Sequence, residues 1–249
     1  MEKLLALLLI AIIALVLFTS FFNLSITTKQ PVTVGNFTET QKQLTNISFQ
    51  GVSLRIPAVD QEGNGVITTL KVETKQGEGR VLVNINQLLF WIDTQNSIRV
   101  AQKVAQNLTG IDLSNIDLIY AIETNASIIE GPSAGAAIAV ATIAAIQNKT
   151  INQSVMMTGT VNSDGSIGPV GEIVAKAKAS KDVGAKLFLV PLGQAVQTRY
   201  KPVERCEKFW HVTYCSIEYK AEKIDVEKET GIQVEEVSNV AEALKYFLI

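Results

Sequence analysis

The 249-residue sequence has little of the chemistry that metal and nucleic-acid sites require. Two cysteines and one histidine, Cys206, Cys215 and His211, do not match the spacing of any metal-binding motif, so no metal site is expected. Only 18% of residues are charged, the formal net charge is −2, and the basic residues are scattered along the sequence. We therefore do not expect this protein to bind nucleic acid. No G-x-x-x-x-G-K-[ST] phosphate loop occurs in the sequence, and no cofactor is expected.

Near the start of the chain, charge is absent over a long apolar run. Residues 4–22 are 19 consecutive uncharged residues, long enough for a helix to cross a bilayer. We therefore predict a transmembrane anchor over residues 1–22. No A-x-A-like cleavage site follows the run, which favours an uncleaved anchor over a cleaved signal peptide. Residues 23–50, rich in Thr, Asn and Gln, are expected to be a polar tether to one domain at residues 51–249.

The flanks of the apolar run indicate how the chain would be oriented in a membrane. Lys3 precedes the run, and Lys29 is the only cation in the 18 residues after it, which favours an extracytoplasmic folded domain. Asn-x-Ser/Thr sequons are frequent, as expected for an exported and glycosylated surface. The alternative is a polar composition that carries no glycan. The sequons begin at Asn23, Asn36, Asn46, Asn107, Asn125, Asn148 and Asn152.

Hydrophobic patterning in residues 51–249 predicts an α+β fold. Alternating apolar residues over 52–56, 66–72 and 81–85 are typical of strands, and 97–108 has the apolar periodicity of an amphipathic helix. Buried strands are predicted over 116–122, 154–158, 167–170 and 186–190, with a closing helix over 240–248. A strand-rich start followed by alternating strands and helices favours this fold class.

A serine stands at a strand-to-helix transition. Glu130-Gly131-Pro132-Ser133-Ala134-Gly135 is followed by a charge-free, Ala-rich run, and 133–147 is predicted to be a helix of about four turns. At the helix N-terminus, backbone N–H groups and the helix dipole can stabilise an oxyanion, so Ser133 is a candidate nucleophile. The alternative is an ordinary N-cap serine in front of a helix whose small residues allow close packing.

A lysine falls on the apolar side of a later predicted helix. In 171–183, the residues Ile173, Ala177 and Val183 define an apolar arc that includes Lys176, while Lys178 and Asp182 project to the opposite side. Burial disfavours a charged amine, so Lys176 is a candidate general base near neutral pH. The alternative is a side chain that extends along the surface and keeps its ammonium in water.

Together these residues resemble the proteolytic domain of Lon proteases. That family has a Ser-Lys dyad, with the serine in a Gly-Pro-Ser-Ala-Gly motif and the lysine on a helix after a Pro-x-Gly turn. Here the motif is Gly131, Pro132, Ser133, Ala134 and Gly135; Pro169-Val170-Gly171 supplies the turn, and Lys176 follows Ser133 by 43 residues. Met157-Thr158-Gly159 also matches the family's Met-Thr-Gly.

The resemblance implies Ser133 as nucleophile, Lys176 as base and Thr158 as a hydroxyl that orients the lysine. Glu130 stands where many members have Asp. Two departures are Glu172, where the family usually has a second Gly, and Val174-Ala175, where it usually has Lys-Glu. The implied structure is the Lon proteolytic-domain (ribosomal-protein-S5-domain-2-like) fold, and the implied assembly is a homo-oligomeric ring.

The implied function is an ATP-independent, membrane-anchored serine endopeptidase acting on unfolded or extended proteins or peptides, because the ATPase loop that Lon proteases carry is absent. Two alternatives are an inactive, Lon-fold binding module at the membrane surface and a GHMP-type kinase whose helix N-terminus binds phosphate.

Residues 194–231 contain the cysteine pair, and we expect either a solvated excursion from the domain or an insertion that gates the site or contacts neighbours. Flanked by Phe209, Trp210 and Tyr214, Cys206 and Cys215 suit a disulfide across a hairpin, with His211 on a hairpin face; free buried thiols are the alternative.

Overall fold

The computed structural model describes residues 51–84, 92–124 and 131–249, which belong to one compact unit. Within these ranges no helix is long and apolar enough to cross a membrane. The predicted anchor, the tether and Glu130 lie outside the described residues, as do four of the sequons. Of the other three, Asn107 and Asn148 are exposed, and Asn152 is half-buried.

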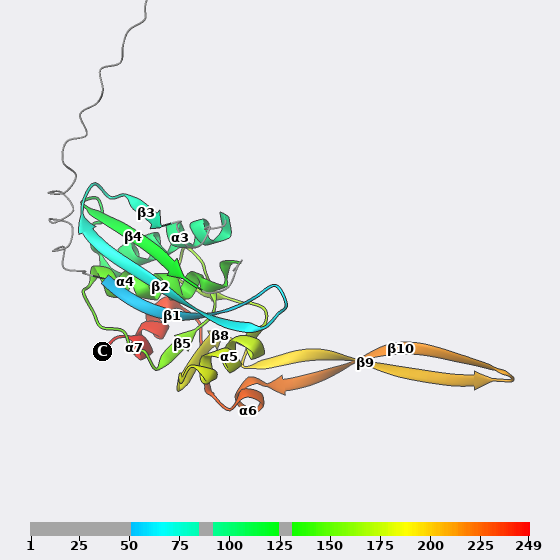
Figure 1. The fold of residues 1–249 in the computed structure, drawn as a ribbon. Helices are drawn as coiled ribbons and strands as arrows, with labels where there is room; N and C mark the ends of the chain where they lie inside the picture. Colours follow the sequence, from blue (N-terminus) through cyan, green and yellow to red (C-terminus); the bar gives the residue numbers. More distant parts are fainter. Residues whose placement is uncertain (1–50, 85–91, 125–130) are drawn as a thin grey trace, which may run out of the picture. The chain divides into compact units, whose positions relative to one another are not determined.

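A four-stranded sheet forms the first part of the domain (Figure 1). It contains β1 (Gly51–Val59), β2 (Gly65–Gln76), β3 (Val81–Asn84) and β4 (Ile116–Glu123) in the order β1-β2-β4-β3. The β1–β2 and β2–β4 pairs are antiparallel, whereas β3 and β4 are parallel and have α3 (Ile92–Thr109) between them in the sequence. A parallel pair requires such a crossover, since a tight turn cannot join the two strands.

The Ala-rich helix α4 (Gly135–Ile146) lies at the centre of the larger core. Every residue from Gly135 to Ala145 is buried, because the run has no charge and its small side chains let neighbouring elements approach from all sides. The helix contacts β1, β2, α3 and α7 (Val240–Phe247). The short 3-10 helix η1 (Pro132–Ala134) precedes it and carries Ser133.

A second sheet and a smaller core form the rest of the domain. Strands β5 (Val155–Met157), β8 (Leu187–Pro191) and β11 (Gln233–Val237) are parallel, in the order β11-β8-β5. Helix α5 (Ile173–Asp182) lies between β5 and β8 in the sequence, and its Ile173 and Ala177 pack with Met156, Phe188 and Val190. The remaining short elements are β6 (Thr160–Val161), β7 (Ile167–Gly168) and α6 (Val226–Thr230). This mixed architecture agrees with the predicted α+β class.

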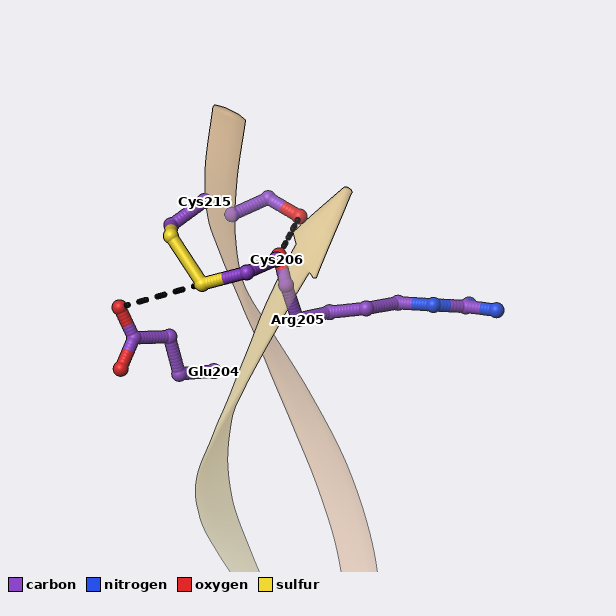
Figure 2. The surroundings of a disulfide bond; sticks show 5 residues. Glu204, Arg205, Cys206 and Cys215 are labelled. Carbon is purple, nitrogen blue, oxygen red and sulfur yellow. Dashed lines mark hydrogen bonds between the residues drawn. A yellow bond between two sulfur atoms is a disulfide. The ribbon is translucent and has the colours of Figure 1, made fainter. Parts of the chain in front are cut away.

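A two-stranded ribbon extends from the domain between β8 and α6 (Figure 1). Strands β9 (Val196–Phe209) and β10 (Val212–Asp225) pair along their full length, and almost all of their side chains are exposed. Cys206 and Cys215 stand opposite each other in the ribbon and form a disulfide (Figure 2). Residues 194–231 therefore contain a hairpin that projects from the domain and a short helix, α6, whose Val226 packs in the smaller core.

Candidate active site

The serine and the lysine meet although 43 residues separate them in the sequence. Lys176 Nζ lies 3.1 Å from Ser133 Oγ and 3.1 Å from the carbonyl oxygen of Gly171. Both distances are within hydrogen-bonding range, so a proton can pass between the amine and the hydroxyl. Pro132 starts η1, where its fixed φ and missing N–H are tolerated, and Gly131 precedes it with φ 102, a conformation that glycine adopts without strain.

Ser133 does not cap the following helix. The N-cap of α4 is Ala134, which forms no side-chain cap hydrogen bond, whereas the Ser133 hydroxyl lies against the lysine amine. The ordinary N-cap interpretation of this serine is therefore wrong. Because α4 begins at Gly135, the reacting hydroxyl lies within two residues of a helix N-terminus, where the helix dipole favours developing negative charge.

Lys176 is buried and its amine faces neutral groups. The residue is 3% exposed, its two hydrogen-bond partners are a hydroxyl and a carbonyl, and it forms no ion pair within the described part of the chain. Burial lowers the pKa of Lys176 to about 8, and the charge of Glu172 partly opposes that decrease. Of the three residues predicted to form the apolar face of this helix, Ile173 and Ala177 are buried. Val183 is 41% exposed because α5 ends at Asp182, one residue before it.

Backbone hydrogen bonds from a separate loop hold the serine turn. Gly159 N donates to the Ser133 carbonyl oxygen at 2.8 Å, and Ala136 N donates to the Gly159 carbonyl oxygen at 3.0 Å. The hydroxyl of Thr158, which is completely buried, also donates to the Ser133 carbonyl oxygen at 3.3 Å. Thr158 thus contacts the backbone of the nucleophile, not the lysine that the resemblance implied it would orient.

The sequence analysis did not identify two backbone groups that hold the Ser-Lys dyad in place. The Gly159 backbone fixes Ser133, and the Gly171 carbonyl oxygen fixes Lys176. Gly159 stands in the Met157-Thr158-Gly159 match and Gly171 ends the Pro-x-Gly turn, so the signal was present, but backbone hydrogen bonds between distant segments cannot be derived from it. Glu172 has a left-handed backbone, φ 56 and ψ 36, at the position where the Lon pattern has glycine.

The disulfide contributes no metal site. Glu204, Cys206 and Cys215 are the one group of three metal-ligand-type side chains that lie close together among the described residues, and all three are exposed. Glu204 Oε1 lies 3.7 Å from the Cys206 sulfur (Figure 2). A sulfur in a disulfide is not a thiolate, so this group lacks the anionic ligands that would bind a soft metal.

Comparison with known proteins agrees with this geometry. The family model of the Lon protease (S16) C-terminal proteolytic domain matches residues 93–208, which include both Ser133 and Lys176. The archaeal Lon protease of Thermoplasma acidophilum is 40% identical over 88 residues, covering 35% of this chain and 13% of the relative. That of Archaeoglobus fulgidus is 29% identical over 140 residues, covering 54% of this chain and 22% of the relative.

A longer match is to the archaeal Lon protease of Thermococcus kodakarensis, 26% identical over 188 residues. It covers 71% of this chain but only 27% of the relative, so the chain corresponds to a minor part of each of these proteins. The family match contains the two residues that the structure brings into contact. These matches, together with the contact between Ser133 and Lys176, support a Lon protease proteolytic domain in this chain.

Proposed function

We propose that this chain is a serine endopeptidase in which Ser133 attacks the peptide carbonyl and Lys176 acts as the general base. The observation that carries the proposal is the 3.1 Å distance between the Ser133 hydroxyl oxygen and an amine that is 3% exposed. The match of residues 93–208 to the Lon protease C-terminal proteolytic domain supports the same assignment.

The lowered pKa of Lys176 makes the amine a usable base. With a pKa of about 8, about a tenth of the amines are neutral at pH 7, about 300-fold more than at the ordinary lysine value of 10.5. The neutral amine takes the Ser133 hydroxyl proton as the oxygen bonds to the peptide carbon. The resulting ammonium then protonates the leaving amine, and a second cycle with water hydrolyses the acyl-enzyme.

The oxyanion that forms during each attack needs hydrogen-bond donors nearby. The N-terminus of α4 begins two residues after Ser133, and its dipole favours an anion there; the N–H groups of Gly135 and Ala136 already donate to the Pro132 and Gly159 carbonyl oxygens. Gly159 fixes the Ser133 carbonyl, so the nucleophile and the start of α4 form one hydrogen-bonded turn. We assign oxyanion stabilisation to this helix terminus.

The proposal extends to ATP independence and membrane attachment. The sequence contains no G-x-x-x-x-G-K-[ST] loop, and residues 4–22 form an uncharged apolar run of membrane-spanning length. Because this sequence contains no such loop, the substrates we propose are unfolded or extended protein segments near the outer face of the membrane. We also propose the ring assembly implied by the family, which light scattering of the detergent-solubilised chain would test.

Digestion of fluorescent casein by the full-length chain tests the proposed function. We expect cleavage without ATP, no stimulation by ATP, and a loss of at least about 1000-fold in Ser133→Ala and Lys176→Met. Lys178→Met is the matched control, because Lys178 lies on the exposed side of the same helix and should retain full activity.

Equal activity in Lys176→Met and wild type would remove the lysine from the mechanism. A wild-type chain that does not cleave casein or peptides, yet is fully folded, would instead support an inactive binding module. Nucleotide binding without proteolysis would support the kinase alternative.

A further inference from the structure

We propose that the tip of the β9–β10 ribbon inserts into the interfacial layer of a lipid bilayer. The tip, defined as residues 209–214, carries the three most exposed large hydrophobic side chains of the ribbon, Trp210, Phe209 and Tyr214, although Tyr219, Ile217 and Tyr200 farther back are also exposed. Trp210 is 82% exposed, Phe209 76%, Tyr214 71% and Val212 67%. This proposal is independent of the peptidase mechanism, because none of these residues touches Ser133 or Lys176.

The distribution of side chains along the ribbon distinguishes its tip from its base. Behind the tip, cross-strand ion pairs join Lys201 to Glu222 at 2.6 Å and Arg205 to Glu218 at 3.4 Å. At the tip, Phe209 faces Val212 across the ribbon, and the turn between them carries Trp210. Apolar groups therefore occupy the end of the ribbon, as expected if the end of the ribbon inserts into a lipid interface.

The turn itself exposes its tryptophan at a conformational cost. Trp210 has φ 56, a left-handed conformation that Gly, Asn and Asp adopt much more readily and that hairpin turns usually assign to them. A bulky aromatic residue at this position therefore does not stabilise the turn. Its exposure is accounted for if the indole contacts a partner beyond the end of the ribbon.

The tip has the composition of a lipid contact. Its three aromatic residues, at about 150–250 Å² each, and one valine supply at most about the 800 Å² that each partner contributes to a standard protein interface. Trp and Tyr are enriched where membrane meets water. No carboxylate occurs from Lys208 to Ile217, and the nearest one along β9, Glu207, stands opposite Tyr214 across the ribbon.

The disulfide makes the tip a single unit. An isolated two-stranded ribbon is marginally stable, and the bond between Cys206 and Cys215 joins its strands three residues before Phe209 and three after Val212. The aromatic side chains are thus held together at the end of the ribbon, and fewer conformations must be lost when they enter a lipid interface.

The two tryptophans of the chain, Trp91 and Trp210, allow a direct test. In Trp91→Phe, Trp210 is the only indole, and the full-length variant is reconstituted in vesicles of phosphatidylcholine and phosphatidylglycerol. We expect a blue-shifted emission, quenching that increases with the fraction of brominated lipid, and protection from aqueous iodide. Adding Phe209→Ser and Val212→Ser should reduce the lipid quenching, with circular dichroism unchanged.

The control is a reporter on the same ribbon but near its base. In Trp91→Phe/Trp210→Phe/Tyr200→Trp, the sole indole occupies a position that is 64% exposed, and it should respond to iodide and not to brominated lipid. Free quenching of Trp210 by iodide in vesicles would overturn the proposal. Protection of Trp210 from both quenchers would also overturn it, since the tip would then be covered by protein.

Discussion

Removing the charge of Glu172 should shift the pH dependence of peptide cleavage to lower pH. If neutral Lys176 is the base, wild-type kcat/KM follows the neutral fraction of an amine with pKa about 8. It should therefore rise about tenfold between pH 6 and 7, about fivefold between pH 7 and 8, and reach a plateau above pH 9. Glu172 raises this pKa, so Glu172→Gln should lower it and bring activity at pH 7 closer to the plateau.

The assay is kcat/KM for a fluorogenic peptide from pH 6 to 9.5, each variant being normalised to its own plateau. Asp182→Asn removes the same charge from an exposed position at the other end of α5, and its profile should match wild type. Glu172→Gly should shift the profile as Glu172→Gln does and also stabilise the fold, because glycine tolerates φ 56. An unchanged or alkaline-shifted profile in Glu172→Gln, or an equal shift in Asp182→Asn, would refute the reasoning.

Three further changes test the scaffold. Gly135→Ala places a Cβ 2.9 Å from Val161 Cγ1 and 3.0 Å from Val161 N, so we expect a loss of about 1–3 kcal/mol in urea unfolding together with reduced cleavage. Hydrogen bonds from Arg80 lower the pKa of Asp117 to about 2; its stabilising effect is present above pH 4 and lost toward pH 2, so the difference in Tm between wild type and Asp117→Asn should shrink over that interval. Cys206→Ser/Cys215→Ser should speed amide exchange at the ribbon tip and leave the main unfolding transition unchanged, because no residue from Val196 to Lys223 belongs to either core.

The elements that sequence predicted well are those with a strong apolar pattern. Strands predicted over 116–122 and 186–190 are observed as β4 and β8 with ends that differ by one residue, and the Ala-rich run forms α4. Helix α3 begins at Ile92, five residues earlier than predicted. Its first turns carry Asp93, Gln95 and Asn96, which have no apolar periodicity, so local pattern could not identify them as helical.

The site was predictable in its reacting groups but not in its supports. Ser133 and Lys176 stand in motifs whose order and spacing are intact, and the structure places them in contact. The acceptor of the Thr158 hydroxyl and the carbonyl that holds the lysine depend on how distant loops pack, which no local pattern contains. Sequence did mark Glu172 as a departure, and its left-handed backbone shows why glycine suits that position.

The position of the dyad between the two cores explains why its geometry depends on the whole fold. Ser133 precedes α4, which fills the larger core, whereas Lys176 lies on α5, whose Ile173 and Ala177 belong to the smaller one. Both helices contact β1 and β2, so these two strands set the spacing between them. A cavity in either core could therefore lengthen the 3.1 Å contact and slow proton transfer without altering a reacting group, because packed interiors transmit such displacements.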